Sequence, residues 1–448
     1  MKQTLILIFS LLLGLPILSQ EIQEQSFSLQ EAIDYALEHN RSALNAQKDI
    51  EAAEQQKWET TATGLPQLDA KIDYQNFIKQ QVQLVPAEFF GGNQGEFLPV
   101  TFGTKQSVNA SATLNQLLFD GSYLVGLQSA KVYLEISENA KEKTDLEVRR
   151  AVINAYGNVL LSKESVEILN RNIQVVEENL NETDKIFQEG LEEQESVEQL
   201  QITLSGLKSN LNRSERLERL AYQMLNITLG LDINSPVTLT DDLEALALQN
   251  MSLDLLNVEE NVSNNIDFQI AENDKISKEL LLKLEKSKFL PTLSAFVNGA
   301  YMGNSNEFSF LQNDQLWYGS SLLGVSLNIP IFSSGMRSAA TQRAKINLDK
   351  AETDLTETEQ QIKLEIAKAK TEYQYAIEDY EIKKENLELA ERIEQKNQTK
   401  FFEGIGSSFD LRQAQTQLYQ AQQDFLQAML NVINFKVDLE TALNTINN

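Results

Sequence analysis

The 448-residue sequence contains no cysteine and a single histidine, His39. Without cysteine, structural disulfides, thiol chemistry and a lipid-modified cysteine at a mature N-terminus are excluded. One histidine and no Gly-x-x-x-x-Gly-Lys loop leave no material for the usual catalytic, metal-binding or nucleotide-binding constellations. We therefore expect no enzymatic activity, no cofactor and no metal site, and we interpret His39 as a surface residue of a polar helix.

Basic residues are also scarce, with 38 Lys and Arg against 65 Asp and Glu and a formal net charge of −27. A nucleic-acid-binding protein needs a basic surface to neutralise phosphates, so that class is excluded. The acidity has a simple interpretation as the solvated surface of long helices. Only 7 prolines and 19 glycines interrupt the chain, and they cluster, so long stretches carry no helix breaker.

Long apolar runs are absent except at the start of the chain. Lys2, the apolar stretch Leu5–Leu13 and the small residue Ser19 have the order of a signal peptide, which we place at residues 1–20. No later run approaches the 18 or so apolar residues of a membrane helix. We expect an exported protein without a transmembrane helix.

The most informative feature present is an internal duplication. Leu114–Gly121 returns as Leu327–Gly335, and Phe187–Leu191 returns as Phe401–Ile405. One constant offset aligns Gly121 with Gly335 and Gly190 with Gly404. Such a repeat predicts a pseudo-symmetric architecture. We divide the chain into repeat 1 (residues 21–230), a linker (231–252) and repeat 2 (253–448).

Each repeat contains a long segment with heptad spacing of small and apolar residues. The clearest positions in repeat 1 are Val148, Val152, Ala155, Val159, Leu169, Ile173, Val176 and Leu180. Between Gly126 and Gly190 there is no proline and one other glycine, which allows a nearly continuous helix of about 60 residues, roughly 90–100 Å long. We predict two long helical hairpins that turn near Gly190 and Gly404, because glycine suits the left-handed backbone at a helix end.

A further helix is expected at the start of each repeat. Ser28, followed three residues later by Glu31, has the pattern of a capping box and opens a helix that reaches about Thr61. Its counterpart is expected over about 253–288. Both helices precede a Leu-Pro pair, which stops a helix.

After each Leu-Pro pair the apolar period changes to two, which predicts amphipathic β-hairpins over about 66–119 and 291–332. One strand, for example, alternates Leu68, Ala70 and Ile72 with polar residues. Strands of about ten to fifteen residues fit a tilted membrane span, and aromatic residues near their ends fit an interfacial girdle. Ordinary β-propensity of aromatic residues is the alternative explanation of that placement.

Four strands cannot form a closed barrel alone, and an open sheet edge is not viable in lipid. Two chains would give eight strands and a filled interior, whereas three would give twelve strands and a lumen. The polar faces of the strands favour the wider barrel. We therefore expect a homotrimer.

Between about Phe27 and Leu443 the chain repeats one order of elements twice. The order is helix, Leu-Pro, strand hairpin, a Phe-Asp-Gly or Pro-Ile-Phe-Ser-Ser-Gly stop, helix, Phe-x-x-Gly tip and helix. This order resembles that of the outer membrane efflux proteins, the TolC-type channels. The resemblance implies an α+β membrane protein of the Gram-negative outer membrane. In it, three chains form a 12-stranded β-barrel and a coiled-coil periplasmic barrel. It also implies that the channel acts together with a periplasmic adaptor protein and an inner-membrane transporter in tripartite efflux or type I secretion.

The same resemblance assigns roles to the hairpin tips. The residues implied in adaptor docking are Phe187, Gly190, Leu191, Phe401, Gly404 and Ile405. Asp410 corresponds to the first position of an aspartate ring at the periplasmic aperture, while Gln413 and Gly406 replace a second aspartate and an arginine that family members commonly have. An acid in the first turn of a helix is the alternative reading of Asp410.

The first tip carries three acidic residues, Glu192, Glu193 and Glu195, where the family is usually more apolar. They predict contact with a basic adaptor hairpin, and the alternative is a solvated tip.

Two other functions remain open from the sequence. A periplasmic coiled-coil scaffold would share the heptads but has no reason to carry amphipathic β-hairpins. An adaptor subunit of an export complex is expected to have one short hairpin and a small β domain rather than this duplicated unit.

Overall fold

The structure, a computed structural model, describes residues 25–258 and 260–445, so the expected signal peptide lies outside the described residues. The described chain forms two compact units, and each takes segments from both sequence repeats. The helical unit comprises the chain up to Asp49, Glu138–Ile270 and the chain from Thr356; the sheet unit comprises Ile50–Ser137 and Ala271–Leu355.

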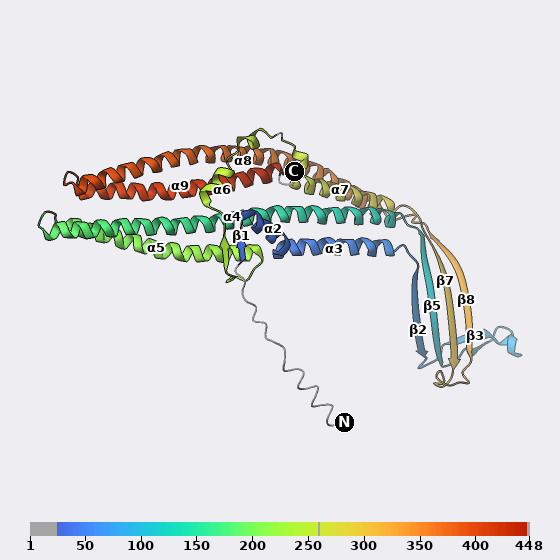
Figure 1. The fold of residues 1–448 in the computed structure, drawn as a ribbon. Coiled ribbons are helices and arrows are strands. Elements are labelled where there is room, and N and C mark those ends of the chain that lie inside the picture. Colours follow the sequence, from blue (N-terminus) through green and yellow to red (C-terminus); the bar gives the residue numbers. More distant parts are fainter. Residues whose placement is uncertain (1–24, 259, 446–448) are drawn as a thin grey trace, which may run out of the picture. The chain divides into compact units, whose positions relative to one another are not determined.

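Two long helical hairpins dominate the chain, as predicted (Figure 1). The first consists of α4 (Gly121–Gln188) and α5 (Gln194–Leu229), and the second of α8 (Met336–Phe402) and α9 (Ser408–Leu443). Helices α5 and α9 both begin four positions after their turn glycine and have equal lengths, which confirms the constant offset read from the sequence. Both turns lie at the same end of the helical unit.

The two turns have the same backbone geometry. At the first, Gly190 has a φ of 76°, its N–H donates to the Phe187 carbonyl, and the Leu191 N–H donates to the Ile186 carbonyl. At the second, Gly404 has a φ of 75° and the equivalent bonds run to Phe401 and Lys400. This pair of bonds is the Schellman motif, which satisfies the last carbonyls of a helix and needs a left-handed residue.

The heptad positions form the core of the helical unit, as expected. The side chains of Val152, Val159, Val176, Val432 and Leu439 are completely buried. Burying such a side chain contributes about 1.5–3 kcal/mol, so this apolar stripe, rather than helix propensity, holds the long helices together.

The helix expected from Ser28 to Thr61 is in fact two helices, α2 (Leu29–His39) and α3 (Arg41–Ala62). The capping box of Ser28 and Glu31 is present. The break comes at Asn40, whose backbone is extended and whose amide nitrogen donates to the Thr228 carbonyl at 2.7 Å. A side-chain bond to a distant segment thus replaces helix continuation.

The matching helix of the second repeat begins later than expected. Two short 3-10 turns, η2 (Leu253–Asn257) and η3 (Val262–Asn264), precede it, and α7 extends over Ile266–Ser287. Asn261 and Ser252 bond their own neighbouring backbone N–H groups, which favours turns over helix.

A buried tyrosine fastens the start of the chain and the inter-repeat segment to α4. Strands β1 (Gln25–Phe27) and β6 (Val237–Leu239) pair in parallel beside it. The Tyr156 hydroxyl lies 2.8 Å from Oδ2 of Asp241 and 3.0 Å from the Phe27 carbonyl oxygen. The same carboxylate oxygen accepts the Leu29 N–H at 2.6 Å. Burial and the Asp241 carboxylate raise the pKa of Tyr156 well above its ordinary value, so the hydroxyl remains a donor.

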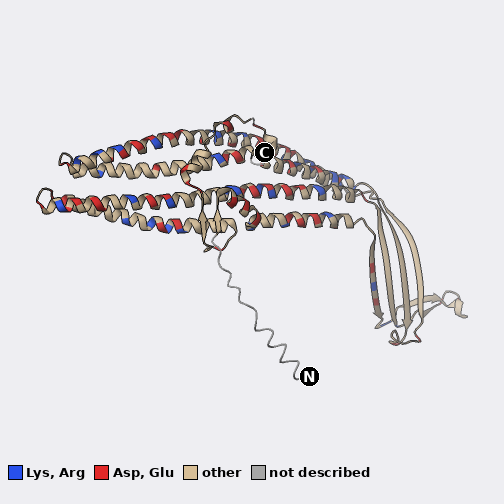
Figure 2. Cartoon of the chain, in the orientation of Figure 1, with Lys and Arg blue, Asp and Glu red and all other residues tan. Residues whose placement is uncertain are grey.

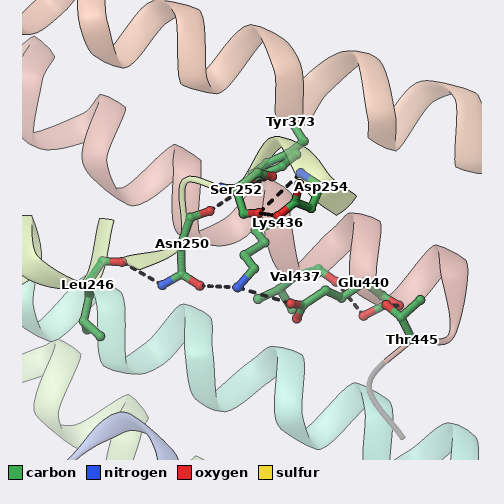
Figure 3. A network of polar contacts seen from close by, with 10 residues as sticks. Leu246, Asn250, Ser252, Asp254, Tyr373, Lys436, Val437, Glu440 and Thr445 are labelled. Carbon is green, nitrogen blue, oxygen red and sulfur yellow. Dashed lines mark hydrogen bonds and ion pairs between the residues drawn. The ribbon is translucent and has the colours of Figure 1, made fainter. Parts of the chain in front are cut away.

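A second buried tyrosine, on α8, holds the segment that follows α6 (Leu243–Gln249). The Tyr373 hydroxyl donates to the Asn250 carbonyl at 2.6 Å and accepts the Ser252 N–H at 2.9 Å. Figure 3 shows this network continuing to α9, where Lys436 bonds the Asn250 side chain at 3.0 Å and pairs with Glu440 at 3.3 Å. The inter-repeat segment is therefore fixed to both long hairpins.

The sheet unit contains a four-stranded antiparallel sheet in the order β2-β5-β7-β8 (Figure 1). Its strands are β2 (Gln67–Asn76), β5 (Gln106–Phe119), β7 (Thr292–Ser305) and β8 (Trp317–Asn328). Each repeat contributes one predicted strand pair, and the β5–β7 pairing joins the two repeats.

The register gives the sheet one apolar and one polar face, as the alternation predicted. Leu114 lies opposite Leu68 on one side and Val297 on the other, and Leu323 continues that row. The intervening rows hold polar residues such as Asn109. Figure 2 shows charges along the helices and few in the sheet, where β2 carries the only charged residues of the four strands.

Across residues 25–258 and 260–445, no helix is both long enough and apolar enough to cross a membrane.

The Tyr156 contact generates a stability prediction. Tyr156→Phe leaves a buried carboxylate oxygen and a buried carbonyl without their hydroxyl partner, so we expect the free energy of unfolding to fall by about 1–3 kcal/mol. Thermal unfolding of the purified protein, followed by far-UV circular dichroism, measures the effect. Tyr380→Phe is the matched control, since buried Tyr380 makes no hydroxyl hydrogen bond of normal geometry in the described structure. Equal effects of the two substitutions would contradict the assigned role of Tyr156.

The turn geometry generates a second stability prediction. A Cβ on Gly404 would meet no atom within 4 Å, so Gly404→Ala tests the left-handed backbone alone and should cost about 1–2 kcal/mol locally. Gly206→Ala is the control, because Gly206 lies inside α5 with the same open surroundings and should gain about 1 kcal/mol. Amide hydrogen exchange near each site should become faster in the first variant and slower in the second. Slower exchange at the Gly404 turn would refute the prediction.

Candidate functional site

The predicted docking residues lie at the ends of the two helical hairpins. Leu191 and Ile405, which directly follow the turn glycines, are 75% and 72% exposed. Phe187 is partly exposed at 37%. Each tip thus presents an apolar side chain to its surroundings at the equivalent position of the two repeats.

Phe401 is placed differently from its counterpart, because it is only 6% exposed. Its ring packs against Phe402 at a centroid distance of 5.2 Å, and it lines a small cavity together with Leu200 of α5 and Leu411 of α9. Phe401 therefore supports the second tip from inside, while Ile405 forms its exposed surface.

The two predicted aperture residues, Asp410 and Gln413, lie on the exposed side of the first turns of α9. Being three residues apart, they share one helix face. The Ser407 hydroxyl caps the helix by accepting the Asp410 N–H at 3.1 Å, and it donates to Oδ2 of Asp410 at 2.7 Å. Asp410 therefore has the position of its alternative interpretation, an acid in the first turn of α9 after the Ser407 cap, and its carboxylate remains exposed.

At the first tip, two of the three glutamates make local hydrogen bonds. Oε1 of Glu192 accepts the Glu193 N–H and the Ser196 hydroxyl, which stabilises the start of α5. Glu195 accepts a bond from the Gln199 amide. All of these carboxylates remain partly or fully exposed, so the tip is an acidic surface.

Polar contacts join the two hairpins near their tips, and the sequence analysis did not find them. Nδ2 of Asn172 donates to Oε1 of Gln422 on α9 at 2.8 Å, and Nε2 of Gln398 on α8 donates to Oδ1 of Asn179 at 2.9 Å. Asn172 and Asn179 are seven residues apart inside the apolar heptad pattern of α4. That spacing is the sequence signal that would have indicated a polar inter-helix contact.

A buried carboxyl group lies between α8 and α9 in the same region. Glu394 is 9% exposed, and burial raises its pKa. Nε2 of Gln415 donates to Oε1 of Glu394 at 3.4 Å, and Oε1 of Gln415 has no hydrogen-bond partner in the described part of the chain. Burial and the Glu394 charge also raise the pKa of Tyr419. The packing near the tips therefore contains polar groups that are incompletely paired.

The chemistry available at the tips suits binding and movement. In the described parts of the chain no three His, Cys, Asp or Glu side chains gather where they could hold a metal ion. What the site offers is a pair of structurally equivalent turns with exposed apolar apices, one acidic flank, and polar helix contacts behind them.

Curated relatives share part of this chain. The toluene efflux pump outer membrane protein TtgC of Pseudomonas putida is 24% identical over 327 residues, which is 70% of this chain and 64% of the relative. The outer membrane protein TolC of Vibrio cholerae is 21% identical over 76% of this chain and 77% of its own length. The alignment with TtgC thus spans slightly less than two thirds of that protein.

Solved structures share the fold at low sequence identity. The outer membrane protein VceC from Vibrio cholerae matches with a TM-score of 0.72 and 16% identity, covering 93% of this chain and 95% of VceC. CusC matches with a TM-score of 0.73 and 18% identity, covering 93% and 91% of the two chains. The combination of long helical hairpins with a four-stranded antiparallel sheet is confirmed as the fold of these proteins.

The sequence model for "outer membrane efflux protein" matches residues 32–231 and 258–445, most of the chain and both repeats. The two matched ranges fall on either side of the inter-repeat segment held by Tyr373. The match confirms the family that the order of sequence motifs resembles. This chain belongs to the outer membrane efflux protein family.

Proposed function

We propose that three copies of this chain form an export channel that carries substrates from the periplasm across the outer membrane. The observation that carries the proposal is the four-stranded sheet, with one apolar face, one polar face and two edge strands, β2 and β8, that pair on one side only among the described residues. An apolar face suits lipid, and a polar face suits a water-filled lumen.

Closure of the sheet needs other copies of the chain. Edge strand β2 of one copy would pair with β8 of the next, so that every backbone group in the membrane is bonded. Three chains give twelve strands, which leave room for a lumen, whereas eight strands are filled by their own side chains. The absence of charged residues from β5, β7 and β8 fits a sheet placed in a membrane.

The helical unit would then form the periplasmic part of the conduit. We assign docking of a periplasmic adaptor protein, itself bound to an inner-membrane transporter, to the exposed tips around Leu191 and Ile405. Relatives named as pump components, such as TtgC, support an efflux assembly. The acidic flank of the first tip, with Glu192, Glu193 and Glu195, favours an adaptor hairpin that carries basic residues.

We assign the periplasmic aperture to the beginning of α9. In a trimer, three copies of Asp410 would form an acidic ring that attracts cations, with the neutral Gln413 one turn further along. The exposure of the Asp410 carboxyl group supports this assignment, since a buried group could not face the pore.

The channel proposal is tested by extraction and electrical recording. We expect the protein to fractionate with outer membranes, to need detergent for extraction, to have the mass of a trimer by light scattering, and to conduct ions in planar bilayers. A periplasmic scaffold would give a protein that is soluble without detergent and forms no pores. That result would reject the channel.

Block of the pore by divalent cations tests the aperture. Asp410→Ala removes both the proposed ring charge and an N-terminal helix contact, and we expect block by Mg²⁺ applied from the periplasmic side to weaken about tenfold or more, as one removed charge per chain permits. Ser407→Ala is the control, because it removes the cap and keeps the carboxylate, so block should persist. If Ser407→Ala weakens the block as much as Asp410→Ala does, Asp410 acts through the start of the helix and not as a charge in the pore.

A further inference from the structure

A separate β-hairpin lies between β2 and β5. Its strands are β3 (Val82–Pro86) and β4 (Phe97–Thr101), joined through the short 3-10 turn η1 (Ala87–Phe90). It forms a two-stranded sheet of its own and projects from the end of the four-stranded sheet (Figure 1). The second repeat has only residues 306–316 at the equivalent place, so the hairpin is particular to the first repeat.

The hairpin exposes an unusual amount of apolar surface. Phe89 and Leu84 are 78% and 68% exposed, and Val82, Phe90 and Phe97 are each at least half exposed. Exposed apolar side chains that gather on one structured hairpin indicate a contact surface. Two strands alone are also only marginally stable in water, so the hairpin needs a covering surface.

The register places Val82, Leu84 and Phe97 of this surface on one face, where Leu84 lies opposite Pro99. The other face holds Val85, Leu98 and Val100 beside Gln83, and Leu98 is less exposed, at 41%. Pro99 has no backbone N–H to donate, which makes strand addition along β4 unfavourable. The apolar side-chain face, rather than the strand edge, is therefore the surface to be covered.

The root of the hairpin lies on the polar side of the sheet. Gly103 and Thr104 line an open cavity together with Asn304 and Tyr318, and the register puts the last two on the polar face. In the proposed channel this face borders the lumen, where lipid is absent. A membrane partner is therefore disfavoured, and the remaining neighbour on that side is the same hairpin of another copy.

We infer that the β3–β4 hairpins of neighbouring copies pack against one another through the face formed by Val82, Leu84 and Phe97, and so narrow the mouth of the channel at the far end of the sheet. The inference rests on the proposed trimer, which brings three hairpins to the same end of one lumen. Like apolar faces from symmetric copies meet in this arrangement and exclude water from each other.

Because the natural chain has no cysteine, single cysteines report this contact directly. Leu84→Cys in outer membranes, treated with a bismaleimide cross-linker, should give a covalent dimer band on a denaturing gel. Gln83→Cys is the matched control, since the neighbouring exposed residue faces the other way, and it should remain monomeric. A double variant, Leu84→Ser with Phe97→Ser, should raise single-channel conductance severalfold if the hairpins narrow the mouth.

The outcomes separate this inference from the channel proposal. Amine-directed cross-linking of the same membranes reports the trimer independently. A trimer in which the Leu84→Cys chain cross-links no better than the Gln83→Cys chain would overturn the hairpin contact and leave the channel standing. Quenching of a fluorophore at position 84 by brominated lipids would show a membrane contact and likewise overturn it. A monomer by amine cross-linking would reject both.

Discussion

Strands β2 and β8 each present one row of backbone N–H and C=O groups that has no partner in the part of the chain the structure describes. In water these groups are hydrated, but in hydrocarbon each unpaired group costs several kcal/mol. The same sheet exposes large apolar side chains such as Leu68 and Leu323 on its apolar face. Exposure of the apolar face to water is therefore unfavourable, and exposure of the two unpaired edges to lipid is unfavourable as well. Pairing of the edges between copies, as in the proposed trimer, would bond these backbone groups and leave the apolar face free to contact lipid.

The helical unit shows a gradient in how its parts are held together. Around Tyr156 and Tyr373 the long helices share a large apolar core, and buried hydroxyls fix the connecting segments. Exposing this apolar surface to water costs about 25 cal/mol per Å², and no contact with water offsets that cost. Near the tips a smaller apolar cluster that includes Leu169, Val176 and Leu200 packs α4 against α5. The contacts between the two hairpins there include amide pairs, such as Asn179 with Gln398, so that this junction is more polar than the core around Tyr156.

Much of this architecture was readable from the sequence because it depends on local periodicity. The heptads predicted the long helices, the alternation predicted the two faces of the sheet, and Gly190 and Gly404 marked the turns. The errors came from both local and long-range contacts. Asn40 caps α3 by accepting the Ser42 N–H at 2.7 Å, which is a local signal, but its bond to Thr228, far along the chain, could not be read from the sequence. The late start of α7 follows from local bonds of Ser252 and Asn261. The amide pairs near the tips join residues more than two hundred positions apart, so their partners could not be read in advance.

The duplication is less uniform than one offset suggested. Helices α3 and α7 have equal lengths, but the offset between their first residues, Arg41 and Ile266, is larger than the one between the turn glycines. The offset changes mainly in the segments between the strands, since residues 77–105 of the first repeat correspond to only residues 306–316 of the second. The long helices have nearly kept their lengths, with 68 and 67 residues in α4 and α8 and 36 residues in both α5 and α9. The strands have not, because β2 and β7 have 10 and 14 residues, and β5 and β8 have 14 and 12. The β3–β4 hairpin of the sheet unit and the unequal tips of the helical unit are two further places where the repeats differ, and in the proposed channel both would meet the surroundings of the conduit.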